Sequence, residues 1–227
     1  IKPMGLSHIE AIIFDAEGVV VDTEILWDKS QEVLLGRRGL QYDRDYLKPK
    51  MAGQTLLQGA ELMVDYYQLD EPAESIEQER KDLIHDLFER EIHFIHGFQG
   101  FINRLNGATI KKSIATAMNK SLMVKVEKKL RLKQFFGDHV YYIEDVDNKS
   151  KPEPDVFLYA AKRLGVDPAR CIVIEDAPHG IEAANRAGMF SVGLVTTFSH
   201  DHLKEADFIA DDFSKLVLFL QNSGIKL

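Results

Sequence analysis

Six short apolar runs occur along the chain, and helical patterns separate most of them. The runs cover residues 9–14, 113–117, 140–143, 171–174, 190–195 and 208–210. Short apolar runs that end in turn residues indicate buried strands. From residue 113 onward, strands and helices alternate with short links, which is typical of a parallel sheet covered by helices on both faces. The pattern therefore predicts an α/β fold with a Rossmann-like parallel sheet.

The stretch from residue 25 to residue 97 has a different pattern, with apolar residues three or four positions apart and charged residues between them. Segments such as "TLLQGAELMVDYYQL" follow this spacing, which predicts helices without strands. We therefore expect an α-helical domain over 25–97, inserted between two parts of a sheet domain, 1–24 and 98–227. Asp22 and Thr23 precede the first of these helices and are candidates to cap it.

Polar residues stand at or just after the ends of several runs. Ligands gather outside the carboxyl ends of the strands in open α/β sheets, so we expect these side chains to lie close together. Four carboxylates at one place would repel one another, and a divalent cation that prefers oxygen ligands, such as Mg²⁺, would offset that repulsion. With a lysine and a hydroxyl, such a set could hold and activate a phosphoryl group. The residues are Asp15, Glu17, Thr116, Lys151, Glu175 and Asp176.

The tripeptide "IED" occurs twice, at 143–145 and at 174–176, each time at the end of an apolar run. The second copy continues into "APHGIEAANRAGM", a helix of small residues that can pack tightly on the sheet near the site. We therefore assign the metal to Glu175 and Asp176, and we expect Glu144 and Asp145 to form a solvated loop edge.

Composition narrows the function classes. The 227-residue chain carries a net charge of −8, which argues against nucleic acid as a partner because phosphate backbones require basic patches. No apolar run approaches the ~20 residues of a membrane helix, so no membrane partner is expected. The single cysteine, Cys171, lies in an apolar run, which favours a core residue in a cytoplasmic protein. Any site for an anionic substrate must be built locally, since the net charge gives no attraction.

Four motifs resemble, in their order and spacing, those of the haloacid dehalogenase (HAD) superfamily. They are "FDAEGVVVDTE", "IATA", "KPEPDVF" and "IEDAPHGIEAANRAGM". The resemblance extends over nearly the whole chain, and it is greatest to the branch with a small helical cap that includes β-phosphoglucomutase and phosphoglycolate-type phosphatases. It implies that 25–97 is a cap domain on a HAD-like core. It also implies a Mg²⁺-dependent phosphatase of a small phosphorylated metabolite, acting as a monomer or weak homodimer.

The resemblance also implies roles for individual residues. Asp15 matches the nucleophile that forms an aspartyl-phosphate, and Glu17 stands at the position of the acid that protonates the leaving oxygen and then activates water. Thr116 and the backbone N–H of Ala117 match the groups that hold the phosphoryl group, and Lys151 matches the lysine that shields its charge. The implied metal ligands are Asp15, the backbone carbonyl of Glu17, Glu175 and Asp176.

Glu17 departs from the family pattern, in which the second acid is usually Asp. The extra methylene moves the carboxyl by more than about an ångström, which matters for proton transfer. The enolase-phosphatases of the same superfamily carry Asp-x-Glu, so Glu17 is compatible with hydrolysis and less so with a mutase cycle. An alternative stays open in which catalysis is weakened and the HAD fold is kept for binding.

The cap loop also departs from the pattern of the sugar-phosphate mutases. Those enzymes have a loop of Gly-x-Ser-Arg type, whereas this chain reads "AGQTLLQ" over 52–58, with Leu56 in place of Arg. Trp27 stands where the mutases tend to have His. We expect Trp27, Gln54 and Thr55 to face the substrate, although Trp27 fits hinge or cap packing equally well. A β-phosphoglucomutase-like mutase is the alternative enzyme.

Three further possibilities are disfavoured. Phosphonatases need a cap lysine, and Lys48 and Lys50 lie near the cap loop, but those enzymes lack the second acid. Haloacid dehalogenases do not use Mg²⁺, and Glu17 with the acids at 175–176 argues against them. The segment "SHDH" at 199–202 could bind a transition metal, and we expect a solvated loop there.

Overall fold

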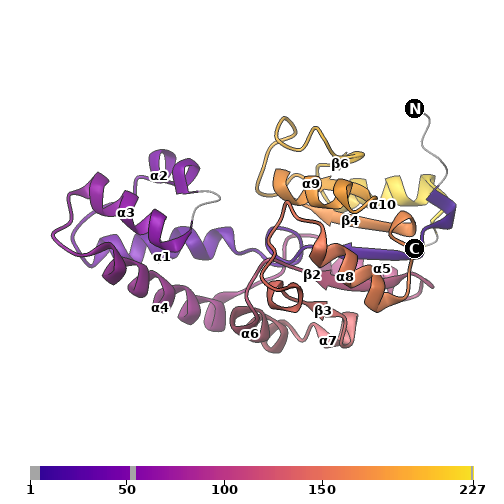
Figure 1. The fold of residues 1–227 in the computed structure, drawn as a ribbon, viewed down its shortest axis with the longest axis horizontal. Coiled ribbons are helices and arrows are strands. Elements are labelled where there is room, and N and C mark those ends of the chain that lie inside the picture. Colours follow the sequence, from indigo (N-terminus) through magenta and orange to yellow (C-terminus); the bar gives the residue numbers. More distant parts are fainter. Residues whose placement is uncertain (1–5, 52–54, 226) are drawn as a thin grey trace. The chain divides into compact units, whose positions relative to one another are not determined.

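The computed structural model describes residues 6–51, 55–225 and 227 of the chain (Figure 1). The chain divides into two compact units. We call residues 1–22 and 93–227 the core unit, and residues 23–92 the cap unit. In the part of the chain that the structure describes, no helix is long and apolar enough to cross a membrane.

The core unit contains a six-stranded sheet in which all neighbouring strands pair in parallel, in the order β3-β2-β1-β4-β5-β6 (Figure 1). The strands are β1 Ala11–Phe14, β2 Lys111–Ala115, β3 Val140–Tyr141, β4 Cys171–Glu175, β5 Phe190–Leu194 and β6 Phe208–Ala210. This confirms the predicted α/β fold. In the central pair, Phe14 of β1 aligns with Ile174 of β4, so the next residues, Asp15 and Glu175, lie side by side at the carboxyl end of this pair.

Helices cover both faces of the sheet because successive side chains of a strand point to opposite faces. Ile13 packs in a buried cluster with residues of α8 and α9. The ring of Phe14 contacts Phe98 and Phe101 of α5 and Phe136 of α7, with ring centroids 5.6–6.0 Å apart. The core helices are α5 Phe98–Leu105, α6 Lys120–Leu130, α7 Lys133–Phe136, α8 Asp155–Leu164, α9 Pro178–Arg186 and α10 Phe213–Asn222, with short 3-10 turns at Leu6–His8, Ile143–Val146 and Pro168–Arg170.

Cys171 begins β4 and is fully buried in the cluster that α8 and α9 form with the sheet. Burial raises the pKa of its thiol to about 12. A buried thiol that stays protonated is inert, so Cys171 acts as a packing residue, as the sequence indicates.

The two unit boundaries fall after residues 22 and 92, whereas the sequence pattern places them after 24 and 97. The second boundary moves because His93 and Phe94 are tied to the core unit. The N–H of Asp22 donates to the carbonyl of His93 at 3.0 Å. Phe94 stacks on Phe98 with centroids 5.3 Å apart and meets Phe135 edge-on.

In its described residues the cap unit contains helices joined by loops and no strand. The helices are α1 Glu24–Gly36, α2 Arg44–Met51, α3 Leu56–Tyr67 and α4 Ala73–Glu91. Its apolar positions meet in a buried cluster of Leu34, Leu35, Ala60, Met63 and Ile76. Thr23 occupies the N-cap position of α1, but its side chain makes no capping hydrogen bond. The expectation that Thr23 caps this helix through its hydroxyl is therefore wrong.

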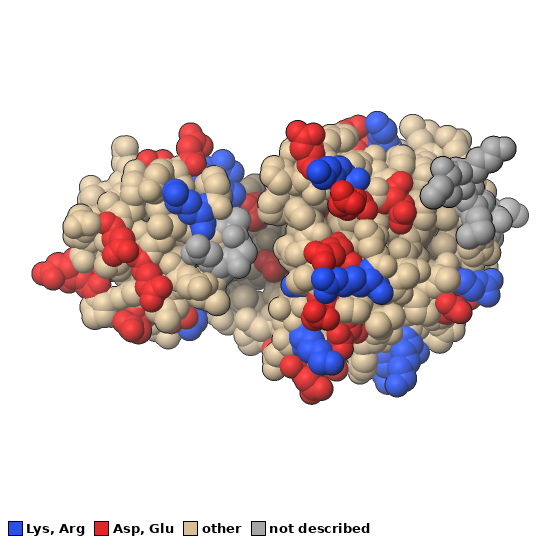
Figure 2. Space-filling view, turned by 45° about the horizontal axis from the view of Figure 1, so that its top comes forward, with Lys and Arg blue, Asp and Glu red and all other residues tan. Residues whose placement is uncertain are grey.

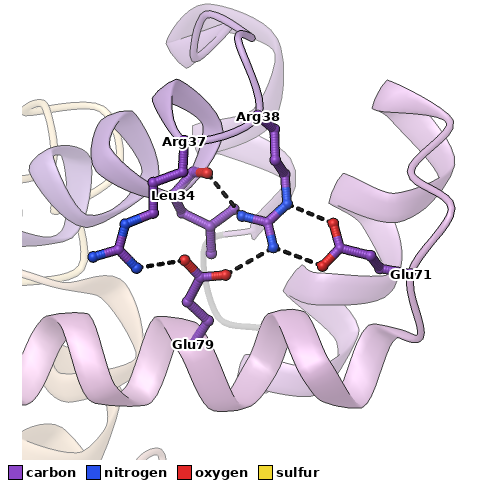
Figure 3. Close-up of polar contacts among 5 residues, drawn as sticks. All are labelled: Leu34, Arg37, Arg38, Glu71 and Glu79. Carbon is purple, nitrogen blue, oxygen red and sulfur yellow. Dashed lines mark hydrogen bonds and ion pairs between the residues drawn. The ribbon is translucent and has the colours of Figure 1, made fainter.

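Figure 3 shows an ion-pair network that joins three segments of the cap unit. Arg38, just after α1, pairs with Glu71 before α4 through two hydrogen bonds of 2.7 and 2.8 Å, and with Glu79 of α4 at 2.7 Å. It also donates to the carbonyl of Leu34 at 2.8 Å, and Arg37 pairs with Glu79 at 2.7 Å. Hydrogen bonding to Glu71 raises the pKa of Arg38, so its charge is permanent.

We expect Arg38→Gln to lower the free energy of unfolding by about 1–2 kcal/mol, because a part-buried guanidinium with paired hydrogen bonds contributes more than an exposed ion pair. Hydrogen exchange should accelerate in residues 68–79. The control is Lys81→Gln, which removes an exposed pair with Glu77 in α4. Equal effects of the two substitutions on unfolding and exchange would contradict a special role for the network.

Candidate active site

Three buried carboxylates meet at the carboxyl end of the two central strands. Asp15 follows β1, Glu175 ends β4 and Asp176 follows it. One carboxylate oxygen of each lies within 4.8 Å of the other two. Their exposed fractions are 6%, 1% and 5%. The side chains of Asp15 and Asp176 are therefore close enough to contact one ion.

Lys151, from the loop before α8, supplies the positive charge of this cluster. Its ammonium group hydrogen-bonds Asp15 and also Glu175, the latter at 2.6 Å. It lies over the ring of Phe157, 4.8 Å from the centroid. Burial alone would lower the pKa of Lys151, but the charges of Asp15 and Glu175 hold it above its usual value. Lys151 is thus a permanent cation.

One lysine does not balance three buried acids. Burial raises the pKa of Asp15 to about 7, and the charges of Glu175 and Glu17 add to this, while Lys151 opposes it. Burial, followed by the charges of Glu175 and Asp15, also raises the pKa of Asp176. A divalent cation would reverse these shifts. A set of buried carboxylate oxygens is the donor type that Mg²⁺ prefers, so the residues present fit that ion.

We expect the stability of the metal-free protein to fall as the pH rises from 3.8 to about 7, since Asp15 has a pKa of about 7 in the folded chain and an ordinary value of 3.8. Between these values the folded state holds a proton that the unfolded state has lost. Unfolding therefore releases a proton in this pH range, so the free energy of unfolding decreases as the pH rises. Denaturant unfolding in EDTA measures this slope. Asp15→Asn should reduce it, and an unchanged slope in that variant would contradict the assignment.

At two positions only glycine leaves room for the carboxylates of the cluster. A Cβ on Gly180, in α9, would lie 1.8 Å from Oε1 of Glu175. A Cβ on Gly18 would lie 1.8 Å from Oδ2 of Asp176, and Gly18 has a φ of +71° that side chains disfavour. Glu175 is further fixed because its Oε2 accepts the N–H groups of Asp176 and Ala177 at 2.8 and 2.9 Å. The loop geometry therefore orients the carboxylates.

Glu17 lies just after Asp15 in the chain, whereas Thr116 and Ala117 directly follow β2, the strand beside β1. Glu17 is half-buried, forms a bridge with Val21, and its charge raises the pKa of Asp15. Thr116 follows β2, the neighbour of β1, and is buried, with its Oγ1 accepting the N–H of Met118 at 3.0 Å. Ala117 is exposed. The structure thus brings these residues to the same end of the sheet as Asp15.

Two threonines after β5 also belong to the site, and the sequence analysis missed them. Thr197 hydrogen-bonds Asp176, which lowers the pKa of that acid. Thr196 donates to the carbonyl of Gly18 at 2.5 Å. The sequence feature that could have identified them is their position at the carboxyl end of β5, the strand beside β4. Polar residues after β5 are candidates for the site for the same reason as those after β1 and β4.

The candidate cap residues lie in the cap unit, except that Gln54 falls outside the described residues. Trp27 is half-buried in α1. Thr55 is the N-cap of α3: its Oγ1 accepts the N–H of Gln58 at 3.2 Å, and its N–H donates to Oε1 of Gln58 at 3.0 Å. Its hydroxyl therefore has a structural role.

The other acidic and histidine-rich segments have surface roles. Glu144 is exposed and accepts the N–H of Lys120 at 2.9 Å, and exposed Asp145 accepts that of Tyr142 at the same distance. His200 pairs with Asp211, which directly follows β6, and His202 hydrogen-bonds Ser199 in the loop after β5. Within the described ranges, only the cluster at Asp15 gathers three potential metal ligands.

The comparisons with known proteins agree with this geometry. A sequence model of the haloacid dehalogenase-like hydrolases matches residues 12–194. The chain belongs to this family. It is 34% identical over 192 residues to (DL)-glycerol-3-phosphatase 1, mitochondrial, from Arabidopsis thaliana, covering 82% of this chain and 63% of the relative. It is 29% identical over 195 residues to the beta-phosphoglucomutase of Bacillus subtilis, covering 82% of this chain and 83% of that enzyme.

A solved structure of a HAD family hydrolase from Deinococcus radiodurans superposes with a TM-score of 0.85 at 23% identity, covering 96% of this chain and 97% of that one. This likeness bears on the fold alone. The family match confirms the predicted HAD-superfamily hydrolase, and the plant relative named above is a phosphatase. The chain spans 63% of the plant phosphatase, so the substrate is a matter for proposal.

Proposed function

We propose that this HAD hydrolase is a Mg²⁺-dependent phosphatase of a small phosphorylated metabolite and that it works through an aspartyl-phosphate on Asp15. The observation that carries the proposal is the buried contact of Asp15 with Lys151, beside Glu175 and Asp176. A structural salt bridge has no need of two further buried acids, whereas an ion-dependent nucleophile does. The plant phosphatase relative supports the substrate class.

The chain's own residues perform the proton and charge transfers in the first half-reaction. The Asp15 carboxylate attacks phosphorus in line, a P–O bond to Asp15 forms, and the bond to the leaving oxygen breaks. Glu17 gives its proton to that oxygen, so the alcohol leaves neutral. Lys151 keeps the carboxylate ionised and shields it from the incoming phosphate. Bound Mg²⁺ would supply positive charge to the transferring phosphoryl oxygens.

The second half-reaction returns the enzyme to its starting state. Glu17, now ionised, takes a proton from water, and the hydroxide attacks phosphorus while the bond to Asp15 breaks. The products are inorganic phosphate and the free carboxylate of Asp15. The hydroxyl of Thr116 and the N–H of Ala117 hold the phosphoryl oxygens in both steps. The proposed metal ligands are Asp15, the carbonyl of Glu17, Glu175 and Asp176.

Hydrolysis fits the cap better than a mutase cycle does. A mutase must grip a second phosphate, and Leu56 stands in place of the arginine that would do so. Its carbonyl accepts a hydrogen bond from Nη1 of Arg80 at 2.8 Å, a contact inside the cap unit.

Small metabolites also fit the surface better than nucleic acid does. On the face shown in Figure 2, Lys and Arg side chains stand among Asp and Glu side chains. Trp27, Gln54 and Thr55 stay candidates for substrate contact.

The test is phosphate release from p-nitrophenyl phosphate and a panel of phosphorylated metabolites, with Mg²⁺ and with EDTA. We expect Mg²⁺-dependent release and a hydroxylamine-sensitive phosphoenzyme after a rapid acid quench. Release that is unchanged in EDTA would overturn the metal dependence. No release from any substrate would favour a HAD fold kept for binding.

We expect Glu17→Gln to lower kcat by about 10²–10³-fold, because amide replacement removes the proton donor and acceptor. The matched control is Glu144→Gln, an exposed glutamate in the 3-10 turn after β3, which should keep full activity. Steady-state kinetics with Mg²⁺ measure both. If Glu17→Gln retained the wild-type rate, Glu17 would be inert and the weakened-catalysis alternative would gain.

A further inference from the structure

A second hollow lies in the core unit and includes none of the acid-cluster residues. Its volume is about 510 Å³. It is formed by the segment that follows the cap unit and by the end of α6 with the turn after it. We call it the hinge pocket; its lining residues are His93, Phe94, Ile95, His96, Gly97, Gln99, Gly100, Lys129, Leu130, Arg131 and Gln134.

The hinge pocket is basic in a chain with a net charge of −8. Lys129, Arg131 and two histidines line it, and no acid does. Among the described residues, neither Lys129 nor Arg131 has an ion-pair partner. The acids nearest to them in sequence are engaged elsewhere: Glu127 accepts the hydroxyl of Tyr142, and Asp138 pairs with a lysine of α7. Two exposed cations, without an ion pair in the described part of the chain, thus line one cavity.

Backbone donors of α5 add to this positive charge. Gly97 is the N-cap of α5 and offers no side-chain cap. The N–H groups of Gln99 and Gly100, both in the lining, have no acceptor within the described chain. A helix start carries partial positive charge and free N–H donors, which favour an anion. Residues with side-chain cations and residues with backbone donors therefore line the same cavity.

We propose that the hinge pocket binds a small anion through a phosphate group, at a site separate from the Asp15 cluster. A guanidinium, an ammonium and backbone N–H groups together match the several acceptor oxygens of phosphate. The inference does not depend on the proposed catalytic function.

The pocket is joined to the segment that follows Asp15. The N–H of Asp22 donates to His93, and the N–H of Ile95 donates to Val20, both at 3.0 Å. Val20 in turn donates to the carbonyl of Ala16 at 2.9 Å. An anion held against residues 93–96 restrains one strand of this hydrogen-bonded pair. We therefore expect slower hydrogen exchange in residues 20–22 and 93–95 when the anion is bound.

The test titrates the 227-residue chain in EDTA with inorganic phosphate, and separately with glycerol 2-phosphate to distinguish free phosphate from a phosphate ester. The ring NMR signals of His93 and His96 report binding in the pocket. We expect saturable shifts of both, and slower exchange at the hinge. Shifts that are absent or do not saturate would overturn the proposal.

Charge variants separate a site from general attraction. Lys129→Gln and Arg131→Asn should each weaken binding by about tenfold, as expected for loss of one charged hydrogen-bond donor. Asn is chosen because residue 131 has a φ of +54°, which Asn tolerates. The matched control is Lys128→Gln, the neighbouring exposed lysine of α6 that does not line the pocket. If this control weakened binding as much, the pocket would not be the site.

Discussion

Asp15→Asn is expected to lower kcat by about 10⁴-fold or more, because an amide cannot attack phosphorus and no other described side chain occupies that place. The structural reason is that β1 and β4 are adjacent and in register, so a carboxylate after Phe14 is the one held against Lys151. The measurement is phosphate release with saturating Mg²⁺, with acid-quench detection of the phosphoenzyme. The phosphoenzyme should be absent in the variant.

We expect Asp15→Asn to leave the protein folded, because of the charge balance at the site when no metal is bound. Burial and the charge of Glu175 raise the pKa of Asp15 although Lys151 opposes the shift, so without a divalent cation the charge of Asp15 is destabilising. We expect Asp15→Asn to be at least as stable as the wild type at pH 8 in EDTA. Mg²⁺ should stabilise it less than the wild type, since one oxygen ligand is gone.

The control is Asp145→Asn, in the other copy of the "IED" tripeptide. Asp145 is exposed and caps a short turn through Tyr142, so its loss should leave turnover within about twofold of the wild type, as for other exposed positions. A rate for Asp15→Asn within tenfold of the wild type, with the phosphoenzyme still formed, would remove Asp15 as the nucleophile.

The fold was predictable because the apolar runs form buried strands, and burial in the sheet determines their apolar composition. All residues of β1 and β4 are buried on both faces, which is why these runs show no polar alternation. Strand ends were less predictable. The run at 9–14 begins as a strand only at Ala11, since Leu6–His8 forms a 3-10 turn and Ile9 donates to Leu6. Such turns depend on local hydrogen bonds that hydrophobicity does not encode.

The residue types of the site could be identified from strand ends, but their supporting contacts could not. Gly18 and Thr196 are 178 positions apart yet hydrogen-bonded, and the need for glycine at 180 appears only once Glu175 lies against α9. The compact units divide after residue 92, and the sequence pattern does not indicate that boundary for a similar reason. His93 pairs with Asp22 across the whole cap unit, a contact that helical spacing in residues 25–97 conceals.

Lys151→Met is expected to lower kcat/KM by about 10³-fold, as for loss of a preorganised charge in a dry site. Met keeps the apolar stem that packs on Phe157 but leaves the Asp15 and Glu175 carboxylates without their shared cation. The metal-free variant should therefore be less stable than the wild type, because breaking a buried pair leaves an unpaired charge. Activity assays with Mg²⁺ and thermal unfolding in EDTA measure the two effects.

The response to Mg²⁺ distinguishes an electrostatic role of Lys151 from simple misfolding. Without the lysine, three acids face the ion with no competing cation, so saturating Mg²⁺ should raise the Tm of Lys151→Met by more than it raises that of the wild type. Lys149→Met is the control. Lys149 stands two positions before Lys151 in the sequence, is exposed, and pairs with Asp155. It should keep wild-type activity and a wild-type Mg²⁺ response. If Lys151→Met gained no additional stability from Mg²⁺, the lysine and the cation would not be sharing the charge of the same carboxylates, and the site would have to be assigned differently.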